Sequence, residues 1–209
     1  TMRIAQQLYE GIDIKGNGTA GLITYLRTDS TRISEEADAN VKTYIKEQYG
    51  EQYVSKGNAG SSKDKKSIQD AHEAIRPTDV SRTPAAMKDS LTRDQFRLYQ
   101  LIWKRFLASR MQPARYETTS VKIAAGKYLF TVSASRIAFE GFRMIYTEAG
   151  EAKEENSVLA RGICMESELT QESFETKQHF TQPPAHYTEA ALVKALEELG
   201  IGRPSTYAP

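Results

Sequence analysis

Residues 92–113 read TRDQFRLYQLIWKRFLASRMQP and contain the change from a helical to a strand-like pattern. Thr92 and Gln95 have the spacing of a capping box, so we expect a helix to begin there. Apolar residues recur every three to four positions through Met111, which predicts one buried stripe: Phe96, Tyr99, Trp103 and Phe106. After Pro113, polar and apolar residues alternate, which is the period of a β-strand. The fold class that follows is α+β.

Upstream of this stretch, the pattern predicts helices joined by a strand and loops. We expect a helix over residues 2–10, a strand over 22–26, and a second helix that Ser34 caps and Gly50 ends. Residues 55–67 contain Gly, Ser and Lys but no large apolar side chain, so we expect a surface loop.

Downstream of Pro113 we expect a separate β domain. The predicted strands are 121–125, 128–132, 142–147, 162–169 and 174–178. Cys164 lies in one of these apolar runs, and we expect it to be a small core residue. A further helix begins after Thr188 and ends at Gly200.

The composition bounds the class of protein. A chain of 209 residues with 39% hydrophobic content is long enough for one large or two small domains. No run approaches eighteen apolar residues and no leader opens the chain, so we expect a cytoplasmic protein without a membrane partner. A single cysteine excludes an internal disulfide and a Cys-rich zinc site.

The charges are distributed unevenly, although the net charge is only +1. Residues 93–115 contain six basic residues and one acidic residue, a net charge of +5. Residues 148–175 contain two basic residues and eight acidic ones, a net charge of −6. This asymmetry is compatible with one region that faces phosphates, and equally with two solvated faces.

Residues 21–30, GLITYLRTDS, contain a pair of residues suited to phosphate chemistry. In an extended segment Tyr25 and Arg27 point to the same side. A phenol is a poor nucleophile at neutral pH and needs a nearby positive charge, which an arginine supplies. By itself the pair is also typical of a half-buried tyrosine and a solvated arginine on an ordinary strand.

Two further segments carry residues of this kind: AHEAIRP at 71–77 and GIGRPSTY at 200–207. Taken alone, His72 is typical of an ordinary surface or core histidine. Taken alone, the Gly-Arg-Pro-Ser run is typical of a turn that starts a helix. A helix that begins at Pro204 would aim free amides at a phosphate. Together with Tyr25 and Arg27, the segments indicate chemistry on nucleic acid.

The phrases ITYLRTDSTRIS, AHEAIRPTDV, LYQLIWKRF and HFTQPPAHYTEAALVKALEELGIGRPSTYA carry a resemblance to a known family. The sequence resembles, from end to end, the central part of bacterial topoisomerase I enzymes, which are type IA DNA topoisomerases. The resemblance implies that Tyr25 cleaves one DNA strand and becomes linked to its 5′ phosphate, beside Arg27 and the active-site histidine, His72. Such an enzyme passes a strand, reseals the break without ATP and relaxes negative supercoils.

The resemblance also implies further DNA contacts and three domains. The implied DNA-binding residues are Gln7, Glu10, Thr28, Asp29, Arg203, Ser205 and Thr206. Residues 1–112 would form a mainly helical, winged-helix-like domain that carries the nucleophile. Residues 113–185 would form part of a β arch, and residues 186–209 the helical start of a DNA-gripping domain.

The sequence departs from the family pattern in one respect that bears on mechanism. It has no Asp-x-Asp-x-Gly stretch, with which the family's TOPRIM domain binds Mg²⁺. We therefore expect no metal site and no cofactor in this chain, although the full-length enzyme would use Mg²⁺. The expected partners are single-stranded or underwound DNA in the nucleoid and the missing TOPRIM half, without which the chain would be inactive.

Two alternatives remain open. The chain could be a non-catalytic module for single-stranded nucleic acid, in which Tyr25 stacks on a base. It could also come from a close relative, topoisomerase III or the topoisomerase half of reverse gyrase, which share the chemistry.

Overall fold

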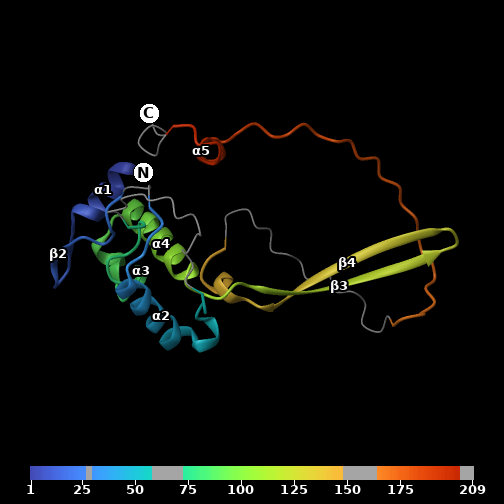
Figure 1. Ribbon diagram of the computed structural model, residues 1–209, viewed down its shortest axis with the longest axis horizontal. Coiled ribbons are helices and arrows are strands. Elements are labelled where there is room, and N and C mark those ends of the chain that lie inside the picture. The colour runs from blue at the N-terminus through green and yellow to red at the C-terminus, as the bar shows by residue number, and fades with distance from the viewer. Residues whose placement is uncertain (27–29, 58–72, 148–163, 203–209) are drawn as a thin grey trace. The chain divides into compact units, whose positions relative to one another are not determined.

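The computed structural model describes residues 1–26, 30–57, 73–147 and 164–202 (Figure 1). The chain forms two compact units, Thr1–Ser157 and Val158–Pro209. The first contains helices and strands, which confirms the α+β class. The finer descriptions (winged-helix-like, β arch, DNA-gripping) and the three expected domains stay predictions.

Four helices of the first unit follow from local sequence signals: α1 (Met2–Glu10), α2 (Glu35–Tyr49), α3 (Pro84–Met87) and α4 (Arg93–Ala108). The capping box of α4 is confirmed, because the Gln95 amide donates to the Thr92 hydroxyl and the Gln95 side chain accepts from the Thr92 amide. Ser34 caps α2 as expected. Short 3₁₀ turns at Glu51–Tyr53 and Lys88–Ser90 complete the helical part.

The predicted stripe of α4 forms the centre of the core. Tyr99, Trp103 and Phe106 are buried, in one cluster with Leu8 of α1 and Val41 of α2. The buried polar atoms of the stripe are satisfied by backbone carbonyls: the Tyr99 hydroxyl donates to Arg82 at 2.6 Å, and the Trp103 indole to Val80 at 3.0 Å. Burial raises the pKa of Tyr99, so this hydroxyl stays protonated as a donor.

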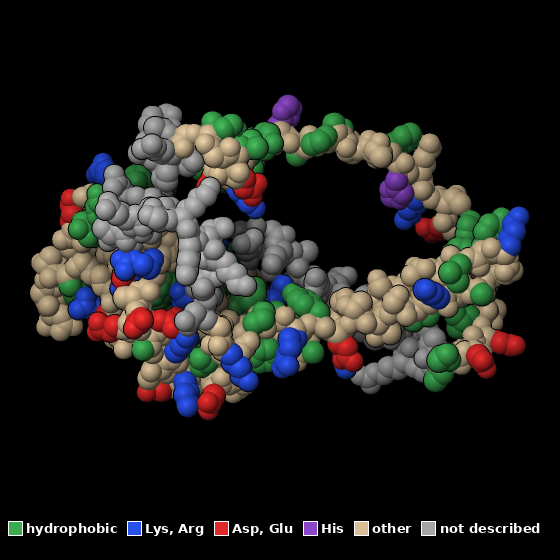
Figure 2. Space-filling view, in the orientation of Figure 1, with side chains coloured by type: hydrophobic (Ala, Val, Ile, Leu, Met, Phe, Trp, Pro, Cys, Tyr) green, Lys and Arg blue, Asp and Glu red, His purple; other side chains and the backbone are tan. Residues whose placement is uncertain are grey.

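Residues 93–115 contain six basic residues, and one of them, Arg110, is not part of a basic surface. Arg110 is buried, and its Nε lies 3.1 Å from Oδ1 of Asp38 in α2. The other oxygen of Asp38 pairs with Lys42 at 2.6 Å. On the face shown in Figure 2, Lys and Arg side chains of the helical part lie among Asp and Glu side chains. The basic excess of residues 93–115 is therefore partly used within the fold.

The strands form two antiparallel hairpins. β1 (Ile12–Ile14) pairs with β2 (Gly18–Ala20), and β3 (Arg115–Ala125) pairs with β4 (Tyr128–Phe139) in a long ribbon (Figure 1). The turn at Gly126, which has a φ of 59°, confirms the predicted strands 121–125 and 128–132. Near this turn the ribbon exposes three apolar side chains: Tyr128, Leu129 and Phe130.

Four of the predicted strands are wrong where the structure describes them. In the strand expected at 22–26, Ile23 forms an isolated bridge with Pro77 and the residues around it are not in a strand. Residues Gly141–Met144 form a 3₁₀ turn, because Gly141 (φ 53°) redirects the chain and lets Phe142 pack on the core beside Ile145. Residues 164–169 and 174–178 form no strand, and the first two residues of the strand expected at 162–169 lie outside the described part. Cys164 is exposed and not a core residue, since no sheet covers it.

In the second unit, α5 (Glu189–Glu198) is the helix that Thr188 was expected to cap, and the Thr188 hydroxyl accepts from the Ala191 amide at 3.2 Å. None of its residues is buried. Across the described ranges of both units, no helix combines the length and the apolar character that a membrane span requires.

Candidate functional site

The segment that carries Tyr25 lies against the end of α1. We refer to residues 21–26 as the tyrosine segment. Its Leu22 amide donates to the carbonyl of Leu8 at 2.8 Å. At Gly21 the approach is closer still, because a Cβ there would lie 2.6 Å from the carbonyl oxygen of Tyr9. A glycine is therefore required for this contact between two backbones.

On its other side the tyrosine segment is bonded to residues 73–78, which we refer to as the support segment. The Thr24 amide donates to the Arg76 carbonyl at 2.9 Å, and the Thr78 amide donates to the Leu22 carbonyl at 3.0 Å. The Thr24 hydroxyl donates to the Ala74 carbonyl at 2.8 Å and accepts from the Arg76 amide at 2.9 Å. Backbone and side-chain bonds together fix the tyrosine segment at this point.

The support segment is itself held by an ion pair. The Arg76 guanidinium donates to one carboxylate oxygen of Glu73 from Nη2 at 2.7 Å and from Nε at 3.0 Å. Its Nη1 donates to the carbonyl of Pro77, which is fully buried. Glu73 and Arg76 of the AHEAIRP stretch therefore have a structural role in the described site.

Tyr25 itself lies at the surface, with 46% of its side chain exposed. Its neighbours Leu22 and Ile23 are buried, so the segment is anchored while the tyrosine remains accessible. The ring of Tyr25 meets the ring of Tyr9 in an edge-to-face arrangement, with 5.3 Å between the centroids and 63° between the planes. The spacing of Tyr9 in the expected helix 2–10 is that of an apolar face, and the sequence alone does not place it beside Tyr25.

Most of the other predicted site residues fall outside the described part of the chain, namely Arg27, Thr28, Asp29, His72, Arg203, Ser205 and Thr206. Their convergence on Tyr25 stays a prediction. The predicted surface loop also falls largely outside it, except for residues 55–57.

Two predicted DNA contacts on α1 are described. Gln7 accepts a hydrogen bond from the side chain of Gln95 at 3.2 Å, which links α1 to the start of α4. Glu10 is exposed and accepts a hydrogen bond from Gln6, one helical turn earlier. Glu10 follows Tyr9 directly, at the end of the helix that contacts the tyrosine segment.

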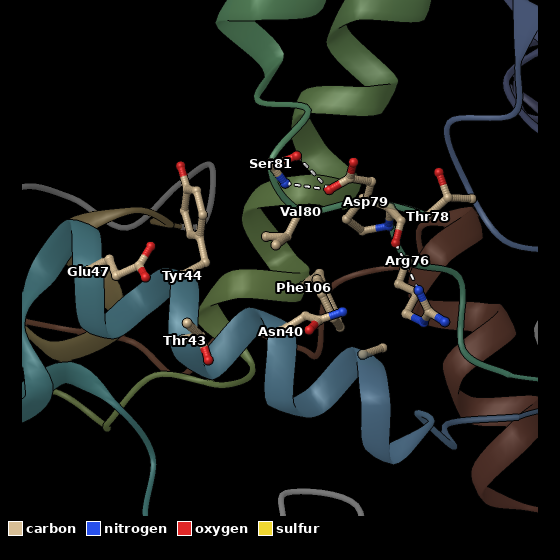
Figure 3. A pocket seen from close by; sticks show the side chains of 12 residues that line it. Asn40, Thr43, Tyr44, Glu47, Arg76, Thr78, Asp79, Val80, Ser81 and Phe106 are labelled. Atoms are coloured by element: carbon tan, nitrogen blue, oxygen red, sulfur yellow. Dashed lines mark hydrogen bonds between the residues drawn. The ribbon is translucent and has the colours of Figure 1, made fainter.

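A pocket of about 350 Å³ lies between α2 and the residues that follow Arg76. In Figure 3, Asn40, Thr43, Tyr44 and Glu47 of α2 line one side, and residues 78–81 line the other. Burial, followed by the charge of the neighbouring Tyr49, raises the pKa of Tyr44, which keeps its hydroxyl neutral. Asp79 in this wall accepts from the amide and hydroxyl of Ser81, so its carboxylate is used within the loop.

A metal ion in a protein is held by several His, Cys, Asp or Glu side chains that lie close together. Within ranges 1–26, 30–57, 73–147 and 164–202, no three His, Cys, Asp or Glu side chains are grouped so that they could hold a metal ion.

Comparison with known proteins assigns the family. The family model of DNA topoisomerases of the bacterial type matches residues 1–209. The chain belongs to the type IA DNA topoisomerase family. The chain is also similar to the full-length topoisomerase I of Thermotoga maritima, with 39% sequence identity and a TM-score of 0.73. That match covers 99% of this chain and 32% of the Thermotoga chain, so the chain spans about a third of the length of that family member.

The hydroxyl of Thr24 offers a direct test of the bonds between the two segments. We expect Thr24→Val to lower the free energy of unfolding by about 1–2 kcal/mol, because the Ala74 carbonyl and the Arg76 amide lose a partly buried partner. The measurement is the urea unfolding midpoint of the chain. The matched control is Thr78→Val, whose exposed hydroxyl donates to the Gly21 carbonyl and can be replaced by water. Equal unfolding midpoints for the two variants would show that the Thr24 hydroxyl does not stabilise the contact between the two segments.

Proposed function

We propose that this chain is the strand-cleaving part of a bacterial type IA DNA topoisomerase, with Tyr25 as its nucleophile. The observation that carries the proposal is the family match over all 209 residues. Support comes from the exposure of Tyr25 on a segment whose backbone is bonded on both sides. A nucleophile for a macromolecular substrate must be accessible and must be carried by a backbone in a fixed position, and both conditions hold for Tyr25.

The proposed reaction is a transesterification. The phenol oxygen of Tyr25 bonds to a backbone phosphorus while the bond from that phosphorus to the 3′ oxygen breaks. The phenol gives up its proton, and the leaving 3′ oxygen takes one up. Resealing is the same reaction in reverse, so no ATP is required. We propose that Arg27 stabilises the developing charge on phosphate and that His72 donates a hydrogen bond to a phosphate oxygen.

The proposed substrate is single-stranded or underwound DNA, and the proposed partner is a TOPRIM domain that holds the Mg²⁺. Strand passage and relaxation of negative supercoils would then be properties of the two parts together. The chain alone would be inactive. The predicted contacts at Gln7, Glu10, Thr28, Asp29, Arg203, Ser205 and Thr206 would hold the cleaved strand.

The test is to identify the covalent adduct and its polarity. The chain, joined to a TOPRIM domain or mixed with one in Mg²⁺, is incubated with a single-stranded oligonucleotide and denatured rapidly. We expect label at the 3′ end of the oligonucleotide to stay on the protein and label at the 5′ end to be released, because the protein holds the 5′ phosphate. Mass spectrometry of the digested adduct should place the nucleotide on Tyr25.

Three outcomes of this experiment would contradict the proposal. Protein-bound label from the 5′ end would reverse the polarity of the linkage. An adduct on another residue would move the nucleophile. Salt-dependent binding of the oligonucleotide without any adduct would favour the non-catalytic binding module.

A further inference from the structure

We propose that Tyr9 is a positioning residue for Tyr25, because its ring fixes the direction in which the Tyr25 side chain points. This inference rests on the proposed function of Tyr25. The observation behind it is the edge-to-face contact of the two rings, whose centroids lie 5.3 Å apart. That distance and the 63° angle lie in the range that attractive aromatic pairs prefer.

The two rings are mounted on backbones that cannot move independently. Leu8, the residue before Tyr9, is fully buried, and its carbonyl accepts from the Leu22 amide at 2.8 Å. The Tyr9 carbonyl lies so close to Gly21 that no side chain fits there. The backbone of α1 therefore sets the distance between Tyr9 and the segment that carries Tyr25.

The exposure of Tyr25 allows a contact with a neighbouring ring to influence its orientation. A tyrosine with 46% of its side chain exposed can occupy several χ1 rotamers, and only one rotamer places the hydroxyl for attack on a given phosphate. A single aromatic contact of this kind shifts a conformational equilibrium by up to about tenfold. The contact with Tyr9 is therefore strong enough to favour one rotamer of Tyr25, which stays exposed.

A purely structural role for Tyr9 fits the contacts less well. The residues of α1 that belong to the buried core are Ala5 and Leu8, whereas 39% of the Tyr9 side chain is exposed. Within the described residues, the ring contact recorded for Tyr9 is the one with Tyr25. Loss of this ring would leave the core intact and remove one contact that orients Tyr25.

The test compares Tyr9→Leu with Tyr9→Phe in the chain joined to a TOPRIM domain. Leucine keeps the helix and the apolar volume but removes the ring, whereas phenylalanine keeps the ring and removes only the hydroxyl. We expect Tyr9→Leu to slow single-turnover cleavage about tenfold, with an unchanged Kd for the oligonucleotide and an unchanged unfolding midpoint. We expect Tyr9→Phe to cleave at the wild-type rate. Tyr128→Leu, an exposed tyrosine on the ribbon, is the matched control and should also cleave normally.

Three results would overturn the inference. Wild-type cleavage by Tyr9→Leu would show that the ring does not position Tyr25. Equal losses in Tyr9→Leu and Tyr9→Phe would assign the effect to the hydroxyl. A tenfold higher Kd for the oligonucleotide in Tyr9→Leu would show that Tyr9 contacts DNA. If the wild-type protein forms no adduct at all, the proposed function fails instead, so the two failures are distinguishable.

Discussion

Replacement of Tyr25 with phenylalanine is expected to reduce formation of the covalent DNA adduct by at least about a thousandfold, to below detection. Phenylalanine lacks the oxygen that forms the bond to phosphorus, and neighbouring groups cannot substitute for a missing nucleophile. The ring remains, so its contact with Tyr9 should persist. Because the Tyr25 side chain is half exposed and outside the buried core, the unfolding midpoint should not change. The measurements are the fraction of oligonucleotide that stays bound to denatured protein and the Kd before denaturation.

The control for this experiment is Tyr9→Phe, the same chemical change in the ring that contacts Tyr25. Tyr9→Phe also removes one phenolic oxygen from the pair, and we expect it to retain normal adduct formation. The two variants therefore separate the loss of a nucleophile from the loss of any hydroxyl in this region. An adduct that persists in Tyr25→Phe would show that another residue attacks the phosphate. Loss of DNA binding in Tyr25→Phe would show that the hydroxyl contacts DNA before the reaction.

Helices α1, α2, α4 and α5 could be predicted from the sequence because their signals are local. The capping box of Thr92 and Gln95 and the caps at Ser34 and Thr188 each depend on residues three positions apart. The apolar stripe of α4 depends on spacing alone, and Tyr99, Trp103 and Phe106 are buried as predicted, whereas Phe96 is only partly buried. Such local signals are sufficient to predict a helix where its apolar face is also the face that packs in the core.

The strands predicted after β4 do not form in the described residues, because alternation of apolar residues does not reveal whether a partner strand exists. Phe142 and Ile145 are separated by three positions, and both pack on the helical core from a 3₁₀ turn. Residues 164–169 and 174–178 contain apolar residues of the strand-like region, but they form no strand in the described part of the chain. Pairing is a long-range property, and the sequence of one strand does not contain it.

The same limit applies to the candidate site. Tyr25 could be proposed as a site residue from its motif, but the hydroxyl of Thr24 bonds to a carbonyl fifty residues away in sequence. The role of Tyr9 was hidden because its spacing on α1 is also that of an apolar face. The structure shows that Tyr9 is exposed although its spacing is that of a buried residue, and the sequence does not contain this information.

Gly21→Ala is expected to have the largest effect of any change that leaves the reacting groups in place. An added Cβ would lie 2.6 Å from the carbonyl oxygen of Tyr9, which is closer than Cβ atoms approach any heavy atom. That oxygen belongs to the backbone of α1 and cannot rotate away, so the tyrosine segment or the helix end must shift. A displacement of about 1 Å between reacting groups reduces rates about a hundredfold. We therefore expect adduct formation by Gly21→Ala to fall about tenfold to a hundredfold.

Gly21→Ala should also lower the free energy of unfolding by about 1–3 kcal/mol, because relief of the contact strains the Leu22 to Leu8 hydrogen bond. The control is Gly57→Ala, where a Cβ would meet no atom within 4 Å, and both its stability and its adduct rate should match those of the wild type. Adduct formation is best measured well below the unfolding midpoint, where both variants are folded, so that the rate reports position rather than stability. A normal rate in folded Gly21→Ala would show that the close approach of α1 stabilises the fold but does not place Tyr25.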